Sequence, residues 1–112
     1  MLIVPVINNT ATLGNVWKQV NAPWLTPSRM LWYRRMYLPD EQRCGDWQAS
    51  PTRAPKELIA KTPKTWIAIA EQDLLATEGL AYGHQLQAAG VPTEIKVYTG
   101  ATHSILALNG EY

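Results

Sequence analysis

Three apolar segments alternate with stretches of helical periodicity along this chain. Residues 2–7 and 65–70 are almost continuous apolar runs with β-branched members, which is typical of strands buried on both faces of a sheet. Residues 94–98 alternate polar and apolar side chains, as expected for a strand with one buried face. Pro5 argues against a central antiparallel position for the first segment. We therefore predict strands near 2–7, 65–70 and 94–98.

Two longer segments have helical signals. Thr26 and Pro27 have the character of an N-cap and a first helical residue, and Pro39 ends the helix that they begin. Residues 9–25 and 39–56 show no clear period and are expected to be loops, whereas 105–108 begin a last short helix. The second long helix is predicted from spacings of three and four residues between Leu75, Gly79, Tyr82, Leu86 and Ala89, with Gly90 as its stop signal.

The order of these elements defines the fold class. Strands that alternate with helices indicate an α/β architecture with a parallel sheet. About three strands would leave an apolar sheet edge without a neighbour, so the sheet looks incomplete. A chain that opens on a buried strand also suggests that Met1 is not the natural beginning of the fold. We expect the first strand to have an edge that is unpaired or is paired with a partner.

Composition and charge narrow the functional classes. The 112 residues are 46% hydrophobic and 17% charged, as in a globular domain, and the net charge of +1 gives no reason to expect nucleic acid or an acidic membrane surface as a partner. No apolar run is long enough for a membrane span. The single cysteine excludes an intrachain disulfide, and with two histidines a zinc site is not expected. We leave the compartment open, with a preference for the cytoplasm.

Two residues at the carboxyl ends of predicted strands could carry chemistry. Asp73 follows the second strand and His103 follows the third, and ligands of open parallel sheets bind at this edge. A carboxylate that accepts the ring N–H of a histidine fixes its tautomer and stabilises the imidazolium. In one hydrolase architecture the triad follows the chain order Ser, Asp, His. The alternative is structural: Asp73 as a cap or turn residue, and His103 as an ordinary loop residue.

The other reactive or aromatic side chains are expected to have structural or surface roles. His84 lies inside a predicted helix and is expected at the surface, and Cys44 is expected to be a partly buried thiol. Three basic residues of the first helix are interpreted as a solvated face: Arg29, Arg34 and Arg35. Four tryptophans of the first half could form an aromatic binding wall, although packing is their commoner use: Trp17, Trp24, Trp32 and Trp47.

A family resemblance adds to this picture. The segment Glu71-Gln72-Asp73-Leu74-Leu75, the pair Glu78-Gly79, and the turn Gly90-Val91-Pro92 before Tyr98, Gly100 and His103 resemble the end of an α/β-hydrolase. The chain is most similar to the hormone-sensitive-lipase-like esterases, strongly over residues 65–104 and loosely elsewhere. The resemblance implies that Asp73 is the triad acid and His103 the triad base. It also implies that residues 9–48 belong to a cap over the acyl pocket.

The same resemblance identifies what this chain lacks. The family has a Gly-x-Ser-x-Gly nucleophile elbow and a His-Gly-Gly oxyanion loop, and neither occurs in these 112 residues. None of the three serines, Ser28, Ser50 and Ser104, has glycines two positions on either side. The chain therefore resembles the C-terminal portion of such an enzyme, with residues 65–104 as the core that carries the acid and the histidine.

Two functional readings follow from the sequence. The first is the C-terminal part of a serine carboxylesterase or lipase that acts on a small-molecule ester without a cofactor. In that case the isolated chain would be inactive, and it would self-associate or pair with the missing N-terminal part. The second is a non-catalytic α/β-hydrolase-like domain that binds a ligand or partner through its sheet edge and tryptophan-rich segment. A peptidase of the same fold remains a further alternative within enzymes.

Overall fold

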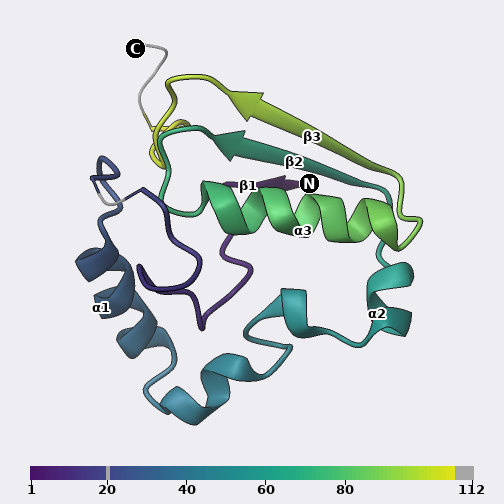
Figure 1. The fold of residues 1–112 in the computed structure, drawn as a ribbon, viewed down its shortest axis with the longest axis horizontal. Coiled ribbons are helices and arrows are strands. Elements are labelled where there is room, and N and C mark those ends of the chain that lie inside the picture. The colour runs from purple at the N-terminus through teal and green to yellow at the C-terminus, as the bar shows by residue number, and fades with distance from the viewer. Residues whose placement is uncertain (20, 108–112) are drawn as a thin grey trace.

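The computed structural model describes residues 1–19 and 21–107 (Figure 1). Its centre is a three-stranded sheet in the order β1-β2-β3, formed by β1 (Leu2–Ile3), β2 (Thr65–Ala70) and β3 (Thr93–Tyr98). Both strand pairs are parallel, and Ile67 lies between Leu2 of β1 and Ile95 of β3. The predicted α/β class with a parallel sheet is confirmed. Within the described residues β1 pairs with β2 alone, so it is an edge strand.

The first strand is much shorter than the sequence predicts. The prediction of a strand over 2–7 is wrong beyond Ile3, because the chain turns at Val4, whose φ of 40° lies in the left-handed region. The amide of Val4 still donates to the carbonyl of Ala68 at 3.0 Å, but Pro5 has no amide hydrogen with which to continue the ladder. Ile7 then enters the core with 3% of its surface exposed. The segment is therefore buried, but not as a strand.

The helices follow the predicted signals closely, with additions. Helix α1 (Pro27–Tyr37) begins at the Thr26 cap, whose hydroxyl accepts from the amide of Arg29 at 3.3 Å, and α3 (Ala76–Ala88) ends before Gly90, which has a φ of 82°.

Three short elements lie where the sequence predicts loop or gives no signal: the 3₁₀ helices Glu41–Gly45 and Pro51–Arg53, and α2 (Lys56–Ala60). Residues 105–107, predicted to begin a helix, form turns, and Leu108 lies outside the described residues.

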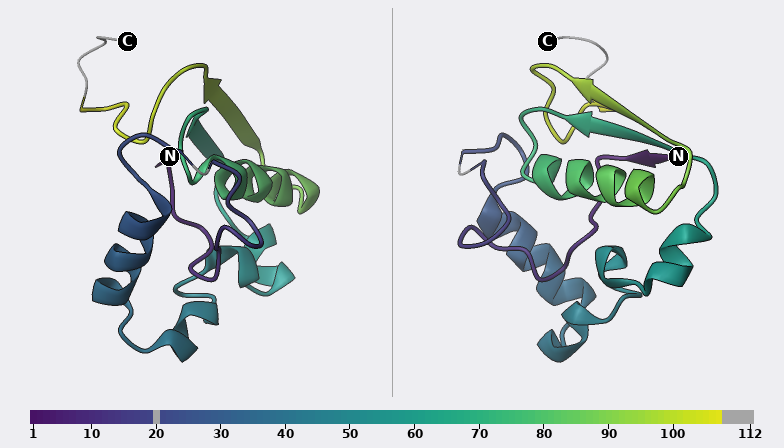
Figure 2. Two further views of the ribbon diagram at one scale, coloured as in Figure 1. Left: turned by 60° about the vertical axis from the view of Figure 1, so that its left-hand side comes forward. Right: turned by 45° about the vertical axis from the view of Figure 1, so that its right-hand side comes forward.

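Helix α3 packs on one face of the sheet, as both views in Figure 2 show. Two glycines permit the close approach. A Cβ atom on Gly83 would lie 2.5 Å from Cδ1 of Ile95, and one on Gly79 would lie 2.7 Å from Cδ1 of Ile69. The core between helix and sheet is built from buried apolar side chains: Ile7, Ile59, Ile67, Ile69, Tyr82, Leu86 and Val91.

A second apolar cluster joins the segment before α1 to the beginning of α3. Its buried members come from the 9–25 segment, from α1 and from the turn after β2: Ala11, Trp17, Ala22, Leu25, Met30, Leu74 and Leu75. In both figures α1 lies to the side of the sheet rather than on its face. This cluster therefore fixes α1 near the carboxyl end of β2. Among the described residues, no helix is long and apolar enough to cross a membrane.

Candidate active site

Asp73 lies in the turn between β2 and α3. Its amide donates to the carbonyl of Ala70 at 3.1 Å, and its Oδ1 accepts from the amide of Leu75 at 3.1 Å. The side chain is buried, with 1% of the residue exposed. A buried carboxylate needs hydrogen-bond partners, and one oxygen is occupied by this turn. The turn role considered from the sequence is therefore real, and it leaves the second oxygen free for another donor.

Hydrogen bonds between the loops after β2 and β3 bring His103 to this second oxygen. Glu71 accepts the amide hydrogen of Gly100 at 2.7 Å, and the amide of Gln72 donates to the carbonyl of Ala101 at 2.8 Å. Gly100 has a φ of 74°, a conformation that favours glycine and turns the loop back toward β2. Nδ1 of His103 consequently lies 3.0 Å from Oδ2 of Asp73.

The geometry of this pair determines its chemistry. Because the carboxylate accepts a hydrogen bond, Nδ1 of His103 carries the hydrogen, and Nε2 is the nitrogen left with a lone pair. The Asp73 side chain is 1% exposed and that of His103 is 32% exposed, so the pair joins a buried anion to a base that reaches solvent. This arrangement orients an imidazole for proton transfer at Nε2.

A cavity of about 730 Å³ opens beside His103. One of its walls is α1, and the other side includes His103, Ser104 and Leu75. The α1 residues at the cavity are Arg29, Met30, Tyr33, Arg34 and Tyr37. Trp24 and Leu25, just before the helix, also line it, with further apolar side chains from Val6, Ala49 and Pro51. The candidate base therefore faces a space of the size that holds a small organic ligand.

The serines of the chain do not form a triad with this pair in the structure. Ser50 is fully buried, where its hydroxyl donates to the carbonyl of Cys44 at 2.6 Å and accepts from the amide of Asn9 at 2.8 Å. Ser28 is exposed on α1. Ser104 lines the cavity but adjoins His103 in the chain. Each has a structural or surface position, and within the described residues none of their hydroxyls is hydrogen-bonded to the ring of His103.

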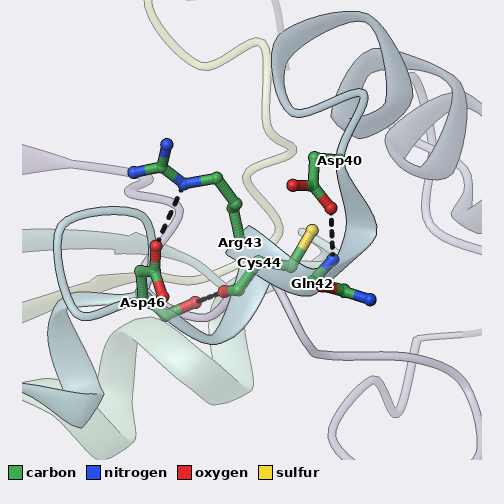
Figure 3. Close-up of polar contacts among 6 residues, drawn as sticks. Asp40, Gln42, Arg43, Cys44 and Asp46 are labelled. Carbon is green, nitrogen blue, oxygen red and sulfur yellow. Dashed lines mark hydrogen bonds and ion pairs between the residues drawn. The ribbon is translucent and has the colours of Figure 1, made fainter.

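The remaining candidates divide between surface and packing roles. His84 is exposed on α3, with its Nδ1 3.2 Å from Gln87, as predicted. Cys44 is a buried free thiol in the 3₁₀ turn of Figure 3, where Asp40 accepts from the amide of Gln42 at 3.0 Å and Arg43 pairs with Asp46 at 3.2 Å.

The tryptophans are divided: Trp17 is 2% exposed in the core, Trp24 lines the cavity, and Trp32 and Trp47 are largely exposed.

The prediction of a solvated arginine face is wrong for Arg34. This side chain is half-buried and its guanidinium carbon lies 5.2 Å from the centroid of the Trp17 ring. Its Nη1 donates to the carbonyl of Ala11 at 2.9 Å. Burial lowers the pKa of Arg34, because the charged form loses water. The helix places Arg34 four residues after the buried Met30, and this spacing was the signal that the sequence offered.

Glu78 is a buried residue to which sequence reasoning assigned no role of its own. It is 4% exposed, and its carboxylate accepts from the amides of Ile7 and Asn8 at 2.8 Å each and from Nε1 of Trp17 at 3.1 Å. Burial raises the pKa of Glu78, although these hydrogen bonds and the charge of Arg34 oppose the shift. The sequence signal for this burial was the position of Glu78 three residues after Leu75 and four before Tyr82, on the buried face of α3.

The described residues include no group of three or more His, Cys, Asp or Glu side chains that could hold a metal ion. The contact between Asp73 and His103 supports the proton transfer of one histidine that a buried carboxylate orients.

Comparison with known proteins identifies the family. The profile of a family described as having the alpha/beta hydrolase fold matches residues 1–107. The chain therefore belongs to the α/β-hydrolase family. It is 37% identical to an AB hydrolase superfamily protein of Schizosaccharomyces pombe, over 97% of this chain and 33% of that protein.

Solved structures agree with this assignment. An esterase of Pyrobaculum calidifontis superposes with a TM-score of 0.84 at 26% identity, over 98% of this chain and 36% of the esterase. Brefeldin A esterase, described as a bacterial homologue of human hormone sensitive lipase, matches with a TM-score of 0.68 at 27% identity, over 74% of this chain and 24% of that protein. The resemblance to hormone-sensitive-lipase-like esterases is confirmed. The chain spans about a third of the length of the relatives it matches.

Proposed function

We propose that these residues are the C-terminal part of a serine carboxylesterase and that they supply the acid and the base of its triad, Asp73 and His103. The observation that carries the proposal is the 3.0 Å contact between Nδ1 of His103 and Oδ2 of the buried Asp73, beside a cavity of about 730 Å³. The names of the similar proteins, esterases among them, favour an ester over a peptide as the substrate class.

The mechanism follows from the free nitrogen of the imidazole. A serine supplied from outside these 112 residues attacks the ester carbonyl while Nε2 of His103 accepts its proton. Collapse of the tetrahedral intermediate breaks the bond to the alcohol, and His103 returns the proton to that leaving group. Water then releases the acid by the same sequence of steps. The Asp73 carboxylate accepts from Nδ1 and stabilises the imidazolium, and the donors to the oxyanion also come from outside this chain.

Residues 9–48 would form part of the cap of such an enzyme. Helix α1 and the residues just before it line the cavity at which His103 lies, as a cap segment over an acyl pocket would. On this proposal the isolated chain has no esterase turnover, because it holds neither the nucleophile elbow nor the oxyanion loop. Its edge strand β1 would pair with the preceding part of the protein or with a second copy.

The test places this chain in an otherwise complete esterase. The chain replaces the matched segment of the Pyrobaculum calidifontis esterase, and hydrolysis of p-nitrophenyl butyrate is measured for the wild-type and His103→Ala forms. We expect His103→Ala to lower kcat by about 10³-fold or more, since the base of a triad acts as a unit with its nucleophile. His84→Ala, at an exposed helical histidine, is the matched control and should retain activity. An active His103→Ala protein, or turnover by the isolated chain, would refute the proposal.

A further inference from the structure

Three side chains in contact, Glu78, Trp17 and Arg34, link α3 to α1, and this set is called the relay below. Oε1 of Glu78, in the first turn of α3, accepts from Nε1 of Trp17 at 3.1 Å. The guanidinium carbon of Arg34, on α1, lies 5.2 Å from the centroid of the same ring. Trp17 is 2% exposed and Glu78 is 4% exposed, so two of the three members are shielded from water. The relay therefore joins the helix that follows Asp73 to the helix that lines the cavity.

The charges of the relay depend on one another. Nε and Nη2 of Arg34 are buried and have no hydrogen-bond partner among the described residues, so the ring face and the carbonyl of Ala11 are the neighbours that stabilise this cation. Glu78 accepts from the N–H of this indole, and Cys44 and Glu78 both act to raise the pKa of Arg34 against the larger lowering by burial. Loss of either partner would leave Arg34 buried with less compensation, and α1 would have to move to return it to water.

Helix α1 has few other anchors. Met30 is its one buried residue, and Tyr33, Met36 and Tyr37 are all more than half exposed. The helix nevertheless forms a wall of the cavity beside His103. Its distance from the sheet therefore depends on Met30 and Leu31, which pack in the second cluster, and on the contacts of Arg34 with Trp17 and Ala11. A shift of α1 would change the size of the cavity without touching the bond between Asp73 and His103.

We propose that Glu78, Trp17 and Arg34 are specificity-determining positioning residues, which hold α1 over the cavity and so set the chain length of the group that fits beside His103. This proposal depends on the proposed ester-hydrolase function, but it concerns how the substrate is bound rather than how a proton is transferred. The cavity would then select among esters by the length of an uncharged hydrocarbon group. Arg34 is itself one of the α1 residues that line the cavity, whereas Trp17 and Glu78 act on the cavity through α1.

Binding of two methyl ketones to the 112-residue chain tests this proposal. 2-Pentanone and 2-nonanone carry an ester-like carbonyl and cannot be hydrolysed, and ligand-observed NMR gives the ratio of their dissociation constants. We expect Trp17→Phe, which removes the indole N–H, and Arg34→Gln, which removes the charge, each to change this ratio by about tenfold, the scale on which a pocket discriminates added methylenes. Arg34→Lys, which keeps a cation over the ring, should restore most of the wild-type ratio.

The controls separate the relay from general damage. Arg35→Gln and Trp47→Phe alter exposed residues of the same types and should leave the ratio unchanged. A wild-type ratio in both Trp17→Phe and Arg34→Gln, an equal change in Arg35→Gln, or no ketone binding to the wild-type chain would overturn the proposal. Failure of the proposed function is seen separately, as activity that survives His103→Ala, because ketone binding involves no proton transfer.

Discussion

Glu78→Ala removes the acceptor that two buried donors and one partly buried donor share. The amides of Ile7 and Asn8 and the indole N–H of Trp17 all point to the Glu78 carboxylate, at 2.8, 2.8 and 3.1 Å. Hydrogen bonds to a charged group contribute about 1.5–3 kcal/mol each, and a buried donor left without a partner costs about 1–3 kcal/mol. The variant also removes a carboxylate whose burial costs several kcal/mol. We expect a net loss of about 2–4 kcal/mol in the free energy of unfolding.

The effect of pH on this loss has a definite sign. Burial raises the pKa of Glu78 in the folded state, so that state binds a proton more readily than the unfolded chain, where the value is about 4.3. The contribution of Glu78 is therefore complete below the unfolded pKa and declines as the pH rises through the folded pKa. The stability difference between the wild type and Glu78→Ala should narrow as the pH rises through that window.

Urea unfolding followed by tryptophan fluorescence and far-ultraviolet circular dichroism measures this difference at a series of pH values. Glu94→Ala is the matched control, because Glu94 is exposed on β3 and should change stability by less than about 0.5 kcal/mol. A Glu78→Ala protein as stable as this control would show that the three donors find other partners at no cost. A stability difference that widens with rising pH would refute the assignment of burial as the dominant cause of the pKa shift.

Two further changes test the packing of α3 and the site. Gly83→Ala should destabilise the fold by about 1–3 kcal/mol, because its Cβ would lie 2.5 Å from Cδ1 of Ile95, even though alanine favours a helix. Chemical denaturation measures this loss, and a variant more stable than the wild type would contradict the close packing. Asp73→Asn should abolish the downfield NMR resonance of the Nδ1 proton of His103, whereas Asp46→Asn at a partly exposed carboxylate should leave it in place. Persistence of that resonance in Asp73→Asn would show that another group holds the ring.

Sequence reasoning predicted those parts of the fold in which local pattern and tertiary structure agree. The strands at 65–70 and near 94–98, and the helices after Thr26 and Leu75, are specified by periodicity and by their stop signals. The error at 2–7 arose because an apolar run indicates burial rather than backbone conformation, and Val4 and Pro5 end the ladder while Ile7 remains in the core. The short α2 helix has too few residues for a periodic signal.

The site was predictable to a different extent. The contact between Asp73 and His103 could be anticipated, because both residues follow predicted parallel strands whose carboxyl ends share one edge of the sheet. The burial of Arg34 was not found, since its environment depends on Trp17, which reaches it from a segment without a period. Glu78 was likewise hidden, because the partners of a buried carboxylate are backbone amides some seventy residues away, and amides leave no mark in a sequence.

The hydrogen bonds that join the Asp73 and His103 loops lie within residues 65–104. Strands β2 and β3 pair in register along their whole length, from Thr65 opposite Thr93 to Ala70 opposite Tyr98, so both loops begin at the same level of the sheet. The bonds from Glu71 to Gly100 and from Gln72 to Ala101 then join these loops directly. Helix α1 has no comparable ladder and is held by Met30 and Leu31 in the second cluster and by the contacts of Arg34 with Trp17 and Ala11. The geometry of the Asp73–His103 pair is therefore set mainly by this part of the sheet, whereas the shape of the cavity depends on contacts that single substitutions can change.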